Sequence, residues 1–112
     1  MKNKTDNYLE RIPKIRQSID WKINEENLVD LILENKGFMN RVFQKFFRKP
    51  KFTYIHLDNL GSFVWNLIDG EKSIVDIGRL LEEGLGDTAE PVYERLAQFF
   101  KILESNRFIE WN

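Results

Sequence analysis

The part of the chain that decides the fold reads LDNLGSFVWNLIDG at residues 57–70 and SIVDI at residues 73–77. Asp58 is an N-cap candidate, and the apolar residues after it share one helical face until Asp69-Gly70 forces a turn. Ser73, with an acid three residues later, is typical of a capping box. These signals predict one helix from Asp58 to about residue 68 and a second from Ser73.

The C-terminal side continues with a third helix and a strand. Gly84 and Gly86 are expected to end the second helix, and a third is predicted to open at Asp87 or Thr88, with Pro91 in its first turn. Its apolar residues recur at helical spacing: Val92, Leu96, Phe99 and Leu103. Residues 107–111 are then predicted to form a short terminal strand. Gly61, inside the first helix, indicates that a neighbouring segment approaches closely.

The N-terminal half has mainly strand patterns. Residues 20–24 and 28–34 predict a hairpin around the polar turn 24–27, and residues 52–57 predict a third strand. The first 20 residues are interpreted as an N-terminal arm that packs through Leu9, Ile12 and Ile15, with a single domain over 21–112. The predicted fold is α+β and winged helix-turn-helix-like, with three C-terminal helices and a small antiparallel sheet from the N-terminal half.

An extra amphipathic helix is predicted near residues 39–47, where apolar residues recur at helical spacing. Its opposite side and the residues after it carry a basic face: Arg41, Lys45, Arg48 and Lys49. The basic face is either solvated helix surface or a docking site for an acidic peptide, a partner or a polyanion. Membrane-surface binding is a further alternative for a basic amphipathic helix.

Composition and charge limit the classes of function that the chain can have. The chain has 112 residues, 42% of them hydrophobic, and no cysteine, which suits one globular domain without disulfides. Residues 1–51 carry 12 Lys or Arg against 7 Asp or Glu, whereas residues 52–112 carry 5 against 11. No apolar run is long enough to span a bilayer or to act as a signal peptide, so a cytoplasmic location is expected.

Catalytic chemistry is not expected, because the residues that it needs are missing from the sequence. With one histidine and no cysteine, the chain can build neither a Cys/His dyad nor a multi-histidine metal site, and no Gly-rich phosphate loop is present. We therefore predict no enzyme activity, no metal and no cofactor. His56 is interpreted as a structural or surface residue, with a hydrogen-bonding or pH-sensitive role at a binding edge as the alternative.

The order and spacing of these elements resemble the PqqD family. The resemblance is carried by residues 57–70, by Ser73-Ile74-Val75-Asp76-Ile77, and by the third helix with its closing pair Phe108-Ile109. It implies a peptide chaperone that binds the leader of a ribosomally made precursor and presents it to a maturation enzyme, often a radical S-adenosylmethionine protein. Binding in such modules is β-augmentation, in which the peptide adds a strand to an exposed sheet edge.

Carried over to this chain, the resemblance implies a peptide groove between the strand at 52–57 and the third helix. The implied contacts are Thr53, Tyr54 and Ile55 on the strand, facing Leu96, Phe99, Phe100 and Leu103 on the helix. Ordinary core packing is the alternative for each apolar member. Two other functions stay open: a nucleic-acid-binding winged helix, which the acidic balance of the second and third helices disfavours, and a structural or regulatory domain with a covered sheet edge. A homodimer is left open as well.

Overall fold

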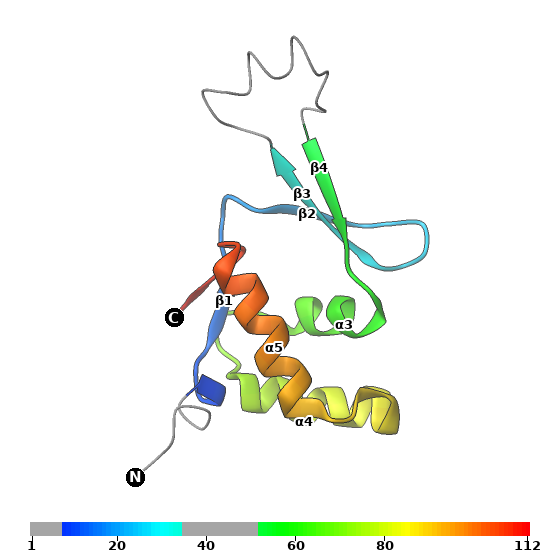
Figure 1. Cartoon of the computed structure of the whole chain (residues 1–112), viewed down its shortest axis with the longest axis vertical. Helices are drawn as coiled ribbons and strands as arrows, with labels where there is room; N and C mark the ends of the chain where they lie inside the picture. Colours follow the sequence, from blue (N-terminus) through cyan, green and yellow to red (C-terminus); the bar gives the residue numbers. More distant parts are fainter. Residues whose placement is uncertain (1–7, 35–51) are drawn as a thin grey trace.

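The structure of the protein is a computed structural model, which describes residues 8–34 and 52–112. In chain order the elements are β1 Pro13–Ile15, β2 Asp20–Ile23, β3 Val29–Glu34, β4 Phe52–His56, α3 Asn59–Leu67, α4 Ile74–Leu85, the 3-10 helix η1 Gly86–Ala89, α5 Val92–Ser105 and β5 Ile109–Trp111. Figure 1 shows β2, β3 and β4 at one end of the molecule and the three main helices at the other, with β1 beside the helices. The predicted α+β class, with its three C-terminal helices, is confirmed.

Strands β2, β3 and β4 form an antiparallel sheet in that order, so the predicted hairpin and third strand are confirmed. The turn of the hairpin is held by Asn24, whose side-chain oxygen accepts from the amides of Glu26 at 2.9 Å and Leu28 at 3.1 Å. Asn27 has a φ of 66°, in the left-handed region that asparagine tolerates better than most residues. Polar turn chemistry therefore fixes the β2–β3 register.

The two ends of the described chain form a second sheet. β1 pairs with β5 in an antiparallel register that places Lys14 opposite Glu110. Leu9 and Ile15 pack against the hydrophobic core, and Ile12 is half-buried. The segment predicted to be an arm thus contains a strand; the domain boundary at residue 21 stays a prediction.

Side-chain caps open the first two helices as the sequence predicts. The Asp58 carboxylate accepts from the Gly61 amide at 2.8 Å at the start of α3. Ser73 and Asp76 form a reciprocal capping box at the start of α4. Gly61 lies against α5, since a Cβ built at this position would be 3.3 Å from the Phe99 ring. The close approach inferred from this glycine is therefore present, and it joins α3 to α5.

The predicted start of the third helix is wrong. Asp87 and Thr88 belong to η1, and α5 begins only at Val92. The residue before a proline is pushed out of helical geometry, and Glu90 accordingly is extended, with φ −71° and ψ 146°. Gly84 lies inside α4, and the helix is capped by Gly86, whose φ of 58° suits glycine.

The core lies between the helices and the inner face of the larger sheet. Its largest fully buried side chains include Trp65 of α3, Leu81 of α4 and Phe100 of α5. Among the described residues, none of the helices has the length and apolar character needed to cross a membrane. The helix predicted at 39–47 and the basic face Arg41, Lys45, Arg48 and Lys49 lie outside the described residues.

Candidate functional site

One edge of the larger sheet is formed by β4, which pairs with β3 on its other side. The Leu57 amide donates to the Val29 carbonyl at 2.9 Å, so Val29 and Leu57 form one of the hydrogen-bonded pairs between β3 and the end of β4. Because hydrogen-bonded pairs alternate in antiparallel strands, Ile55 exchanges its hydrogen bonds with β3, whereas the amides and carbonyls of Tyr54 and His56 point outward. Within the described part of the chain these outward groups meet no partner. The backbone groups of Tyr54 and His56 thus define the β4 edge of the sheet in the described part of the chain.

The strand residues implied by the family resemblance lie at this edge. The Tyr54 side chain is 49% exposed and lies on the outer face of the sheet, and Thr53 is also exposed. Ile55 is half-buried opposite Leu31, on the face that packs against the core. The edge of β4 thus presents Tyr54 and His56 on the outer face and Thr53 and Ile55 on the inner face.

The helix residues implied by the resemblance are mostly core. Leu96 and Phe100 are fully buried, and Leu103 is only 2% exposed. Phe99 is half-buried, and its ring makes an edge-to-face contact with Phe100 at 5.7 Å between centroids. Of these four side chains, Phe99 therefore has the most surface available to a ligand, and peptide contact by any of the seven residues stays a prediction.

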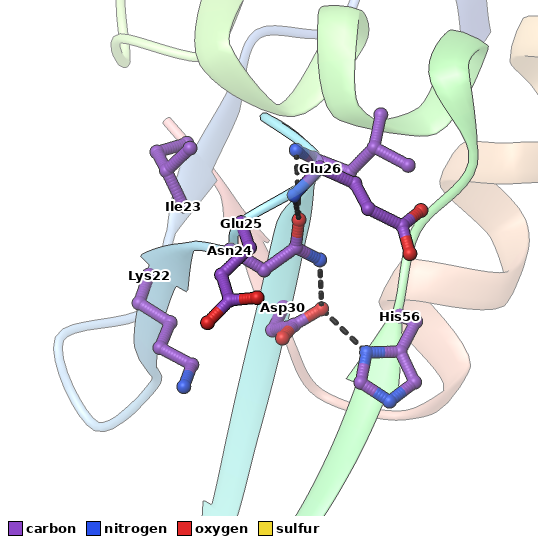
Figure 2. A pocket seen from close by; sticks show the side chains of 8 residues that line it. Lys22, Ile23, Asn24, Glu25, Glu26, Asp30 and His56 are labelled. Atoms are coloured by element: carbon purple, nitrogen blue, oxygen red, sulfur yellow. Dashed lines mark hydrogen bonds and ion pairs between the residues drawn. The ribbon is translucent and has the colours of Figure 1, made fainter.

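A polar cluster on the outer face of the sheet links β4 to the hairpin turn. His56 Nδ1 lies 2.5 Å from Asp30 Oδ1, and the Asn24 side-chain amide donates to the same oxygen at 2.9 Å. Figure 2 shows these three side chains converging in a pocket that Lys22, Glu25 and Glu26 also line. The sequence singled out His56 but not its partner, because Asp30 is opposite His56 only once the β3–β4 register is known.

The electrostatics of the cluster favour an ionised Asp30. The hydrogen bond with His56, followed by the one from Asn24, holds the pKa of Asp30 below its ordinary value, although burial opposes this. The Asp30 side chain is only 5% exposed, whereas that of His56 is 71% exposed. One partner is therefore fixed inside the protein while the other presents most of its ring to solvent.

The outer face next to this cluster also carries an aromatic and cationic pair. Lys22 Nζ lies 5.4 Å from the centroid of the Tyr54 ring, a cation–π contact between β2 and β4. Trp21, on the inner face of β2, contacts the Trp65 ring edge-to-face at 6.2 Å. Alternation along the strands thus separates a polar outer face from the inner face that joins the helices.

The described residues hold no group of three or more His, Asp or Glu side chains arranged to bind a metal ion. The described edge presents backbone donors and acceptors, the exposed Tyr54 ring, and the His56 imidazole held by Asp30.

Comparison with known proteins identifies the family. Neither the search of curated proteins nor that of solved structures gave a match. The model of the family described as coenzyme PQQ synthesis protein D (PqqD) matches residues 50–109. That range contains β4, the helices α3, α4 and α5, and the first residue of β5, whereas β1, β2 and β3 precede it. Because the match covers more than half of the chain and confirms the resemblance, the protein belongs to the PqqD family.

Proposed function

We propose that the protein is a non-catalytic recognition module that binds the leader of a ribosomally synthesised precursor peptide and presents it to a maturation enzyme. The proposal is supported by family membership, because PqqD-like proteins act as recognition elements for such precursors. As the family resemblance implies, the enzyme is often a radical S-adenosylmethionine protein. The structural observation that carries the proposal is the outward-facing backbone of Tyr54 and His56 on β4.

Strand addition at this edge explains how affinity and selectivity arise together. Main-chain hydrogen bonds to Tyr54 and His56 would bind any extended peptide, so they provide affinity with little sequence preference. Side chains of the peptide would alternate between the outer face, beside Tyr54 and His56, and the inner face, on the side of Ile55. Selectivity then depends on the groups that those two faces present.

The test uses a peptide selected from a display library of twelve-residue sequences by binding to the full chain. Tyr54→Pro removes one outward amide from β4, and a proline is tolerated at an edge position because no ladder bond is lost. The matched control is Ile23→Pro, which removes an outward amide from β2 on the opposite edge of the same sheet. Tyr54→Ala separates loss of the ring from loss of the amide.

We expect Tyr54→Pro to weaken binding by about tenfold or more relative to Tyr54→Ala, roughly 1.4 kcal/mol for a hydrogen bond lost from a strand pair. Ile23→Pro should bind like the unaltered chain. Circular dichroism and amide spectra establish that each variant is folded. Equal affinity of Tyr54→Pro and Tyr54→Ala, or an equal loss in Ile23→Pro, would rule out strand addition at β4.

A further inference from the structure

His56 occupies a special position on the proposed binding edge. Its backbone faces outward, and its side chain lies on the outer face, where it is 71% exposed. Figure 2 shows one ring nitrogen directed at Asp30 and the other pointing away from it. A strand added to β4 would place a residue directly across from His56, with a side chain on the same face as the imidazole.

The polar cluster fixes which nitrogen of the ring carries a proton. An ionised carboxylate only accepts hydrogen bonds, so the contact between Asp30 and Nδ1 requires a proton on Nδ1. Nε2 then carries a proton only when the ring is cationic. Asn24 anchors the same Asp30 oxygen and is itself held by the turn amides, so the ring has a rigid support. Nε2 is thus an acceptor in the neutral ring and a charged donor in the cationic ring.

The charges around the ring come from each neighbouring element. Asp30 on β3 is ionised and partners the ring, while Lys22 on β2 adds a positive charge to the outer face. Glu25 and Glu26 of the turn line the pocket and are exposed, so solvent screens their charges. Because Asp30 accepts from Nδ1 of His56 and from the Asn24 amide, Nε2 is the ring nitrogen that is left for a group on an added strand.

We propose that His56 is a specificity-determining residue that donates a hydrogen bond from Nε2 to an Asp or Glu carboxylate on the bound strand, at the position across from it. The inference rests on the proposed strand addition at β4 and names the side chain that this edge selects. Donation from Nε2 needs the cationic ring, so binding of the carboxylate is linked to uptake of a proton and is favoured by a lower pH. Asp30 acts as the positioning residue for the ring.

The experiment compares two peptides at two pH values. A library-selected peptide that contains an acidic residue is synthesised in its original form and with each Asp or Glu replaced by Asn or Gln. Dissociation constants are measured at pH 6.0 and 8.0 for the unaltered chain and for His56→Gln, which keeps a polar side chain but has no imidazole ring. Imidazole nitrogen shifts of the free protein report independently whether the neutral ring carries its proton on Nδ1.

For the unaltered chain we expect the acidic peptide to bind about tenfold more tightly at pH 6.0 than at 8.0, which is a typical size for a charge-assisted hydrogen bond at an exposed site. One amide replacement in the peptide should abolish this difference, and so should His56→Gln. Tight binding with no dependence on pH or on any acidic residue overturns the inference but leaves strand addition intact. Failure to select any binder at either pH overturns both.

Discussion

Ser62 tests how the sheet is attached to the helices. This α3 residue is 4% exposed, and its hydroxyl accepts from the Val29 amide at 2.9 Å while donating to the Leu57 carbonyl at 3.2 Å. The hydroxyl thus bridges the last rung between β3 and the segment that follows β4. Ser62→Ala leaves the Val29 amide, which belongs to a fully buried residue, without an acceptor.

The expected loss in the free energy of unfolding follows from that buried amide. An unsatisfied buried donor costs about 1–3 kcal/mol, so we expect Ser62→Ala to lower stability by about 2 kcal/mol. The matched control is Ser105→Ala, because the Ser105 hydroxyl donates to the Ile102 carbonyl at 3.0 Å on an exposed helix end. That change should stay within about 0.5 kcal/mol.

Urea denaturation followed by tryptophan fluorescence gives both values, and amide exchange at Val29 gives a local readout. Val29 should exchange faster in Ser62→Ala than in the unaltered chain. If both serine variants lost the same small amount, the hydroxyl bridge would not be what joins the sheet to α3. In that case the Val29 amide would donate directly to the Leu57 carbonyl.

Three further perturbations test packing and charge. Gly78→Ala should lower the free energy of unfolding by about 1–2 kcal/mol, because the new Cβ would lie 2.4 Å from the Tyr93 ring; this clash outweighs the helix preference of alanine. Adding Tyr93→Ala to the same chain should recover part of the loss, as measured by urea unfolding. Tyr8→Phe should leave the free energy of unfolding unchanged or raise it by up to about 1 kcal/mol, since the Tyr8 hydroxyl is buried without a hydrogen-bond partner among the described residues. The same burial raises the pKa of Tyr8 to about 12. A loss above about 1 kcal/mol would show that the hydroxyl does have a hydrogen-bond partner. The Ser73 amide holds the pKa of Asp76 below its ordinary value. The resulting stabilisation of the fold is therefore complete above the pKa that Asp76 has in the unfolded chain, and it is lost as the pH falls through the pKa of the folded protein. Asp76→Asn should make the free energy of unfolding less dependent on pH in the acid range, and an unchanged dependence would contradict this role of Asp76.

Local signals made the helices and strands predictable. The Asp58 cap and the capping box at Ser73 each depend on residues three apart, so they can be read directly from the chain. The same holds for the hairpin, whose turn is organised by the Asn24 side chain. The start of α5 differs from the prediction because Pro91 restricts Glu90 to an extended conformation, so Asp87 and Thr88 form a separate 3-10 helix.

Pairings between distant segments were not predictable from local patterns. β1 and β5 come from opposite ends of the described chain, and short strands of three residues carry little signal of their partners. The contact between Asp30 and His56 likewise depends on a strand register. Helical spacing predicted an apolar face on α5, but it could not separate buried Leu96 and Phe100 from half-exposed Phe99, because periodicity does not reveal how deeply a face is packed.

The central claim is that β4 provides the edge to which a peptide adds as a strand. Hydrogen exchange of individual amides, measured with and without a saturating library-selected peptide, tests it most directly. We predict that the outward amides of Tyr54 and His56 become strongly protected on binding, while those of Trp21 and Ile23 on the β2 edge keep their exchange rates. Protection that appears at Trp21 and Ile23, with Tyr54 and His56 unchanged, would contradict it.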